Sequence, residues 1–136
     1  MKREDKVISL GLAKEIDLWS AEKDVAPTVS QYYWVRNKAD SFFFLQEGVK
    51  PLDKKYYPAY DTAELGEMVG NQSYIVSGKY DGSLYICKLD RAVVSLKDDA
   101  LIQRMFEEET EFVETTEAEA RGRLYLWLLK EGYING

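Results

Sequence analysis

The sequence predicts an α+β fold, in which a small antiparallel sheet from two hairpins has an N-terminal and a C-terminal helix packed on it. Apolar residues recur at helical spacing near both ends of the chain, and two pairs of short β-rich runs, each pair joined by a turn-prone segment, lie between them. With 136 residues, 46% of them hydrophobic, the chain suits one core. Residues 1–136 are therefore expected to form a single domain.

The N-terminal helix is predicted over residues 9–22. Leu12, Ala13, Ile16 and Trp19 share one face of such a helix, and charged residues lie elsewhere. Ser9 is a suitable N-cap, because its hydroxyl can accept a hydrogen bond from a free amide of the first turn.

Two hairpins are predicted in the middle of the chain. The aromatic and β-branched runs QYYWVR, residues 31–36, and SFFFLQ, residues 41–46, are separated by the turn-prone residues 37–40. Residues 73–89 hold a second pair of β-rich runs around Tyr80, Asp81 and Gly82, and Asp-Gly is a strong hairpin signal. The turn length of this second hairpin, and with it the strand register, stays open at this point.

A short helix is predicted over residues 62–69. Asp61 and Glu64 have the spacing of a capping box, in which each side chain bonds the backbone amide of the other residue. Tyr60 and Leu65 occupy the positions of a hydrophobic staple, and the apolar stripe of this helix ends at Gly70.

The C-terminal helix is predicted over residues 117–131. Thr116 and Glu119 form a second capping-box pair, and Gly132 stands where helices end in a left-handed conformation. Tyr133 is then placed to contact Leu128.

The segment 91–109 is ambiguous. Ser95 with Asp98 is suited to cap a helix, and the apolar residues of that helix would be Leu101, Ile102, Met105 and Phe106.

The acidic charge is concentrated in one segment. The chain carries a formal charge of -6, yet residues 107–119 hold seven Glu and no Lys or Arg, and the remainder has 17 acidic and 18 basic residues. Overall charge gives no support for a polyanion-binding surface, so nucleic acid is not expected as a partner, although a local basic patch stays open. We interpret the acidic segment as a solvated face that favours the following helix N-terminus. A cation site, a protein-binding surface and a DNA-mimic surface are the alternatives.

Composition limits the chemistry of the chain. It has no histidine and one cysteine, which excludes Ser-His-Asp and Cys-His triads and, in practice, a structural zinc site. We expect no cofactor and no metal, and no catalytic residue is assigned. The competing class is an enzyme that works with carboxylates alone, either a hydrolase with paired Glu and Asp or a Mg²⁺-dependent phosphotransfer enzyme.

Cys87 and the N-terminal segment indicate the compartment. Cys87 lies in the apolar run LYICKL and is expected to be a buried small hydrophobe. A single cysteine cannot form an intrachain disulfide, so a reducing compartment is the simpler interpretation. The N-terminal segment is too charged for a signal peptide, and no run of about 18 apolar residues occurs. We expect a cytoplasmic protein without a membrane segment.

Aromatic residues are the first candidates for a binding surface. The chain holds ten Tyr and three Trp, and many of them gather around Pro51 and Pro58. Strand alternation puts Tyr32 and Trp34 on one face and Tyr33 on the other, so at least one of them should belong to the core. Core packing is the first interpretation for the group. The alternative is an exposed recognition platform, with candidate partner-binding residues Tyr32, Trp34, Tyr57 and Tyr60.

Leu126 raises the question of self-association. The six consecutive apolar residues 124–129 exceed what one buried helix face requires, and Leu126 falls beside the polar sector of the helix. Either another element of the same chain covers Leu126, which is the first interpretation, or a second molecule covers it in an isologous homodimer. Leu126 is therefore the fifth candidate contact residue.

Two segments, YYPAYDTAELGEMVG at residues 56–70 and TEAEARGRLYLWLLKEGYI at residues 116–134, carry a resemblance. Together they resemble a family of small uncharacterised proteins of phages, prophages and gut bacteria, and they cover roughly a quarter of the chain. Glu119 stands where that family often has Asp, and Gly122 replaces a helix-favouring residue. The family has no assigned activity, so the resemblance implies a phage-related origin and no functional residue.

These observations favour a noncatalytic binding or interaction protein with an unidentified protein partner. The carboxylate-based enzyme and an acidic DNA-mimic inhibitor remain the alternatives, and each requires carboxylates to be free and grouped in space.

Overall fold

The structure is a computed structural model that describes residues 3–27, 29–36, 42–51, 54–69, 75–91, 94, 98–108 and 110–133. The elements follow one another in the order η1 (Arg3–Lys6), α1 (Leu10–Glu22), β1 (Tyr32–Arg36), β2 (Phe43–Glu47), β3 (Lys55–Pro58), α2 (Thr62–Val69), β4 (Ile75–Asp81), β5 (Leu84–Leu89), α4 (Asp99–Glu107), β6 (Glu111–Glu114) and α5 (Glu117–Lys130).

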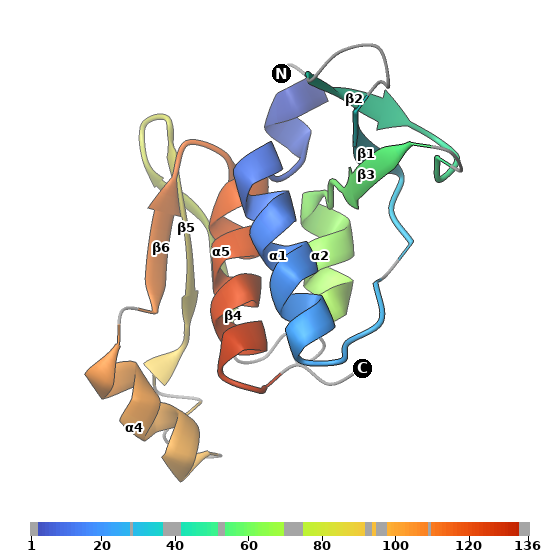
Figure 1. The fold of residues 1–136 in the computed structure, drawn as a ribbon. Coiled ribbons are helices and arrows are strands. Elements are labelled where there is room, and N and C mark those ends of the chain that lie inside the picture. The colour runs from blue at the N-terminus through green and yellow to red at the C-terminus, as the bar shows by residue number, and fades with distance from the viewer. Residues whose placement is uncertain are drawn as a thin grey trace.

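The strands form two separate antiparallel sheets, in the orders β2-β1-β3 and β4-β5-β6. Both predicted hairpins are present, and with helices near both ends of the chain they confirm the α+β class. The hairpins do not share one sheet, because β3 extends the first and β6 extends the second. Figure 1 shows the two sheets on opposite sides of the helices.

The structure also decides the register of the second hairpin. Asp81 lies opposite Leu84, so Gly82 and Ser83 form the turn, and Gly82 has a φ of 52° that favours glycine. A register shift between Lys79 and Asp81 marks a bulge just before this turn. The turn predicted for the first hairpin lies outside the described residues.

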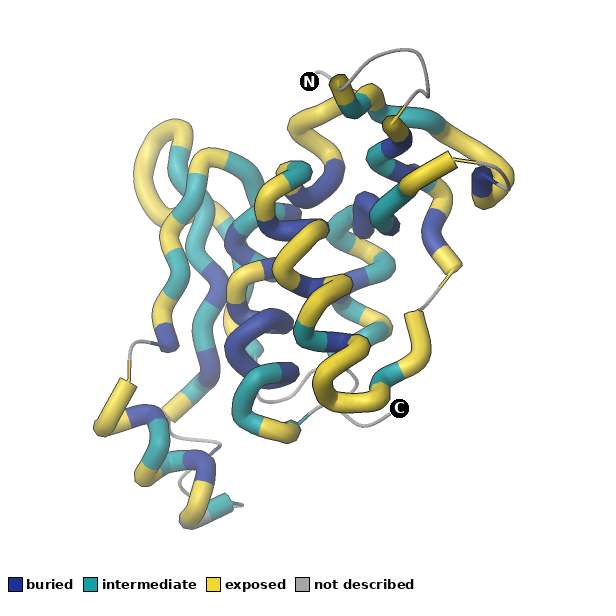
Figure 2. The backbone as a smooth tube through the Cα atoms, viewed as in Figure 1, coloured by how far each residue is buried: buried dark blue, intermediate teal, exposed yellow. Residues whose placement is uncertain are grey.

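Helix α5 is the centre of the core. Helices α1 and α2 pack on one side of it and the sheet β4-β5-β6 packs on the other, as Figure 1 shows. The residues of segment 124–129 are all buried, and they appear dark blue in Figure 2. Their side chains divide between the two sides: Tyr125, Leu126 and Leu129 join the cluster with α1 and α2, and Leu124, Trp127 and Leu128 join the cluster with the sheet. The long apolar run is therefore the signature of a helix that is buried on two sides.

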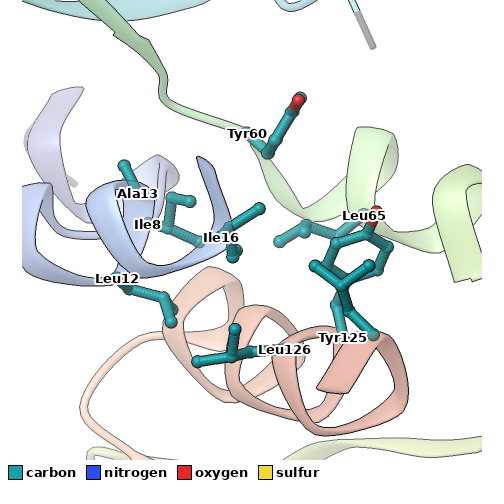
Figure 3. Close-up of a cluster of buried hydrophobic side chains, with 9 residues drawn as sticks. Ile8, Leu12, Ala13, Ile16, Tyr60, Leu65, Tyr125 and Leu126 are labelled. Atoms are coloured by element: carbon teal, nitrogen blue, oxygen red, sulfur yellow. The ribbon is translucent and has the colours of Figure 1, made fainter. Parts of the chain in front are cut away.

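Leu126 is covered by its own chain. It is 5% exposed, and Ile8, Leu12 and Ile16 belong to the same cluster. Figure 3 shows Leu126 projecting from α5 toward α1. The intrachain interpretation is confirmed, and Leu126 gives no reason to expect a homodimer.

Helices α1 and α5 approach each other closely at Gly122. A Cβ atom built at this position would lie 2.6 Å from Ile8 Cγ2 and 2.7 Å from Leu12 Cδ2. Carbon atoms are normally about 3.5–4.0 Å apart at contact, so a larger residue does not fit without a shift. The poor helix former found in the sequence is thus required by packing.

The predicted N-caps of α1 and α2 are present. The Ser9 hydroxyl accepts from the Leu12 amide at 3.3 Å. Asp61 and Glu64 form a reciprocal capping box, in which the Glu64 amide donates to Asp61 at 2.8 Å and the Asp61 amide donates to Glu64 at 2.9 Å. Tyr60 and Leu65 are both buried in the α1-α2-α5 cluster, as the staple predicts.

The predicted second capping box forms only in part. The Glu119 amide donates to the Thr116 hydroxyl at 3.1 Å, but the Glu119 carboxylate turns to Ser9. It accepts from the Ser9 amide and from the Ser9 hydroxyl, each at 2.8 Å. Glu119 therefore joins the N-terminal ends of α5 and α1 instead of closing its own cap.

The end of α5 follows the sequence prediction. Gly132 has a φ of 82°, its amide donates to Leu129 O at 3.2 Å, and the Tyr133 amide donates to Leu128 O at 2.9 Å. These are the two bonds of a Schellman motif. The Tyr133 ring also stacks on Trp127, with 6.2 Å between ring centres.

Strands β3 and β6 depart from the sequence prediction, and α4 confirms the helix offered as one interpretation of segment 91–109. Strands β3 and β6 were not expected, because four residues each are too few to show a period and both are held by pairing with a neighbouring strand. Helix α4 begins after Asp98, whose side chain accepts from the Leu101 amide at 3.0 Å. Ser95 lies outside the described residues.

Candidate interaction surface

Two of the five candidate contact residues lie in the interior. Tyr60 and Leu126 are 3% and 5% exposed. The N′ position of the α2 staple draws Tyr60 inward, and the two-sided burial of α5 encloses Leu126. A partner cannot reach either side chain in this conformation.

The other three candidates are partly buried. Strand alternation places Tyr33 and Val35 in the interior and leaves Tyr32 and Trp34 intermediate, as predicted. The Trp34 Nε1 donates to Ile8 O at 3.0 Å, and Trp34 and Tyr57 pack against the α1-α2-α5 cluster. These side chains fasten the β2-β1-β3 sheet to the helices, so the side of this sheet that faces α1 is not an open platform.

The opposite side of the same sheet carries exposed rings and lysines that the sequence analysis did not single out. We call Phe42, Phe44, Tyr56, Lys50 and Lys54 the lysine–aromatic surface. Phe42 and Phe44 are 78% and 42% exposed, and both lysines are exposed. The Lys54 ammonium lies 5.8 Å from the centre of the Phe44 ring, and the Lys50 ammonium lies 5.4 Å from that of Tyr56.

Strand register brings the rings together. Phe44 in β2 and Tyr56 in β3 both lie opposite Val35 of the central strand β1, so the three side chains share one side of the sheet. The middle of this side is closed, because Val35 is fully buried. Phe42 comes just before β2 and two residues before Phe44, and alternation extended by one residue beyond the strand places it on that side. The Tyr56 ring is held by an edge contact with the buried Tyr33, at 5.7 Å between ring centres.

A sharp turn after β2 positions Lys50. Gly48 has a φ of 110°, which favours glycine, and its amide donates to Gln31 O at 2.8 Å. The Gln46 side chain donates to Val49 O at 3.2 Å, which ties the turn to the strand. Hydrogen bonding to Tyr56 raises the pKa of Lys50 above its ordinary value.

The charge of this region differs from that of the whole chain. Residues 31–60 hold five basic and three acidic residues, although the chain as a whole has a charge of -6. Neither Lys50 nor Lys54 forms an ion pair with a carboxylate in the described part of the chain. The run FFF followed by closely spaced lysines is the sequence signal that could have predicted this surface. The composition of the whole chain does not reveal it.

The carboxylates of the acidic segment 107–119 that the structure describes are occupied by contacts within the chain. Arg104 binds Glu107, Glu108 and Glu131, each at 2.8–2.9 Å. The Trp127 Nε1 donates to Glu108 at 2.7 Å, and this bond lowers the pKa of the Glu108 carboxyl. These contacts attach α4 to the end of α5.

The remaining described carboxylates of the segment are also engaged. Glu111 lies 3.9 Å from Lys88, Glu114 lies 2.6 Å from Arg123, and Glu117 lies 3.4 Å from Arg121. Together with the Glu119 bonds to Ser9, this pattern uses the acidic charge to hold elements together. It does not produce the free stripe of charge that the DNA-mimic hypothesis requires.

A groove gives the carboxylate-based enzyme hypothesis its best location. It has a volume of about 690 Å³ and lies between η1, strand β5 and the N-terminal ends of α2 and α5, with Asp5, Asp61 and Glu117 in its lining. Asp61 caps α2, and Glu117 accepts from Ser77 at 3.3 Å as well as from Arg121. Burial raises the pKa of Asp17, but Asp17 belongs to α1 and not to this groove. With Asp61 and Glu117 engaged in this way, the described lining of the groove shows no carboxylate pair that is poised for acid-base work.

The described residues contain no group of three or more acidic or cysteine side chains placed to hold a metal ion. Cys87 is 1% exposed, and burial raises the pKa of its thiol to about 11. It is a buried apolar side chain, as predicted. None of the helices in the described ranges is long and apolar enough to cross a bilayer.

Protein-family models, curated proteins and solved structures all lack a match to this chain.

Proposed function

We propose that the protein is a noncatalytic binding protein of phage-related origin, and that it contacts its partner through the lysine–aromatic surface. The observation that carries this proposal is the exposure of Phe42 and Phe44 beside two lysines. Exposed rings grouped with cations are typical of recognition surfaces, whereas isolated exposed apolar residues are not.

The noncatalytic part of the proposal follows from how the polar groups are used. In the groove Asp61 caps α2 and Glu117 binds Arg121, and the thiol of Cys87 is buried. A side chain that caps a helix, binds arginine or is buried is poorly suited to transfer protons or to attack a substrate.

The origin and the compartment are supported by sequence features alone. The segments 56–70 and 116–134 support a phage-related origin, and the single cysteine supports a cytoplasmic location. Phage structural genes beside the coding sequence would support the proposed origin. A neighbourhood of metabolic genes only would contradict it.

The binding function is tested with immobilised protein and a lysate of the native host. The wild type is compared with a Phe42→Ser/Phe44→Ser double variant. Phe106→Ser is the matched control, because Phe106 is 68% exposed and also has a cation near its ring, Arg91 at 5.4 Å. Retained material is measured as protein and as nucleic acid, with and without nuclease treatment.

The expected result is that the double variant retains less of one component and the Phe106→Ser variant retains as much as the wild type. Equal retention by all three proteins would show that the surface binds nothing in the lysate. Circular dichroism of each variant confirms that a loss of retention is not a loss of folding.

A further inference from the structure

The lysine–aromatic surface has a chemistry that points to one class of partner. We infer that it binds single-stranded nucleic acid, with bases stacked on the rings of Phe42, Phe44 and Tyr56 and phosphates next to Lys50 and Lys54. This inference rests on the proposed function of the same surface.

The spacing of the rings suits successive bases. Phe44 and Tyr56 lie on the two strands that flank β1, so their backbones are about 9.6 Å apart, from two interstrand spacings. Phe42 and Phe44 are two residues apart, which is about 6.7 Å along a strand. Aromatic side chains on neighbouring strands of a sheet stack two or three bases in single-strand readers.

The two lysines lie close enough to the rings to reach the phosphate of a nucleotide whose base is stacked there. Each ammonium lies within 6 Å of a ring centre, at 5.8 Å for Lys54 with Phe44 and 5.4 Å for Lys50 with Tyr56. Each ammonium lies over its ring, so a base that stacks on that face displaces the ammonium. The lysine side chains are long and exposed, which lets the displaced ammonium reach the phosphate of the same nucleotide. Ring and cation thus recognise the two parts of one nucleotide.

The net negative charge of the chain does not argue against nucleic acid as a partner, because the segment that carries this surface is basic. The segment 31–60 has an excess of basic residues, and the acidic segment 107–119 is held in internal contacts. The polyanion would meet the basic part of the molecule.

Stacking separates this partner from a duplex or an acidic protein. In a duplex the base faces are buried in the stack, so the rings of this surface would gain nothing from it. An acidic peptide without aromatic residues would satisfy Lys50 and Lys54 but has no ring face for Phe42 or Phe44. The inference commits to unpaired bases, and binding of a protein instead is an outcome of the test.

The test is fluorescence anisotropy with a labelled oligodeoxythymidylate of about 10 nucleotides, started at about 50 mM salt because the ionic contacts weaken as salt rises. Two neutralised phosphates predict a slope of log affinity against log salt of about -1.4, from about -0.7 for each phosphate on a single strand. Phe44→Ala should weaken binding at least about fivefold, which is the lower end of the loss seen on removing one stacking ring. Lys54→Ala should weaken binding and reduce the slope by about 0.7.

Matched controls are provided elsewhere on the chain. Phe106→Ala removes an exposed ring next to Arg91, and Lys23→Ala removes an exposed lysine that lies 5.9 Å from the Trp19 ring centre. Both should leave oligonucleotide binding unchanged. Circular dichroism and thermal unfolding of every variant show whether it is folded.

Several results would overturn the inference. They are absence of oligonucleotide binding by the folded wild type, binding that Phe44→Ala leaves unchanged, equal binding of a duplex of the same length, and equal competition by polyglutamate. If the lysate component is protein, survives nuclease treatment and depends on Phe42 and Phe44, the inference fails while the proposed function stands. If neither the lysate nor the oligonucleotide responds to changes at this surface, both fail.

Discussion

Replacing Gly122 by alanine should destabilise the protein, although alanine is the better helix former. Gly122 lies inside α5, where the change from glycine to alanine normally stabilises by about 1 kcal/mol. The added Cβ would lie 2.6 Å from Ile8 Cγ2 and 2.7 Å from Leu12 Cδ2. Overpacking of a buried site typically costs about 1–3 kcal/mol, so two effects of opposite sign compete.

The clash should prevail because the neighbours cannot move away. Ile8 is fully buried, and its Cγ2 is attached directly to a branched Cβ, so relief requires rotation about χ1 or a backbone shift. Leu12 is 3% exposed, although its Cδ2 is at the end of a more adaptable side chain. We expect a net loss of about 1 kcal/mol, which for a chain of this size lowers Tm by about 4 °C.

The assay is urea or thermal unfolding of Gly122→Ala together with Gly11→Ala. Gly11 lies in α1 with nothing within 4 Å of a built Cβ, so alanine there should stabilise by up to about 1 kcal/mol. In an Ile8→Ala background, the Gly122→Ala change should cost less, because the Cγ2 atom is gone. Equal stabilisation by both alanine substitutions would refute the close approach of α1 and α5.

Three further predictions concern the cap of α2, the core and the acidic contacts. Asp61→Ala should lower the free energy of unfolding by about 1 kcal/mol by removing the N-cap acceptor of α2, and an unchanged denaturant midpoint would contradict this. Leu126→Glu should cost at least about 3 kcal/mol with no change in the mass measured by light scattering, whereas Leu18→Glu, at a side chain that is 65% exposed, should change stability by less than about 0.5 kcal/mol. A folded Leu126→Glu protein of half the wild-type mass would instead reveal a dimer. The lowered pKa of Glu108 means that folding favours its charged form, so its contribution is present above the ordinary value of 4.5 and is lost as pH falls through the lower folded-state value. Denaturant unfolding from pH 7 down to pH 3 should therefore show a weaker pH dependence for Glu108→Gln than for the wild type, and identical profiles would contradict the role of the Trp127 bond.

Local signals in the sequence predicted the elements that are specified locally. The cap at Ser9, the Asp61 and Glu64 box and the Gly132 ending depend on residues within one or two turns, and each is present. The hairpins depend on nearby turn residues and are present as well. Strand β6 was not predicted, because a four-residue strand with two Glu is held by its pairing with β5 and not by its own pattern.

The candidate site was predicted less well than the fold. Of the aromatic candidates, Trp34 and Tyr57 pack against the helices, whereas the exposed rings of this sheet are Phe42 and Phe44, with Tyr56 partly buried. Which side of a strand faces the core depends on where α1 packs, and alternation alone gives two equivalent choices.

The sequence by itself determined the α+β class, the caps, the two hairpins and the buried thiol, because these follow from short-range backbone chemistry and from hydrophobicity. Only the tertiary structure decided that the hairpins belong to separate sheets and that Leu126 is covered by α1. It also decided that the described carboxylates of the acidic segment bind groups of the same chain, as Glu119 binds Ser9. These features join residues that are up to 110 positions apart, and no local pattern records which distant surface an element will meet.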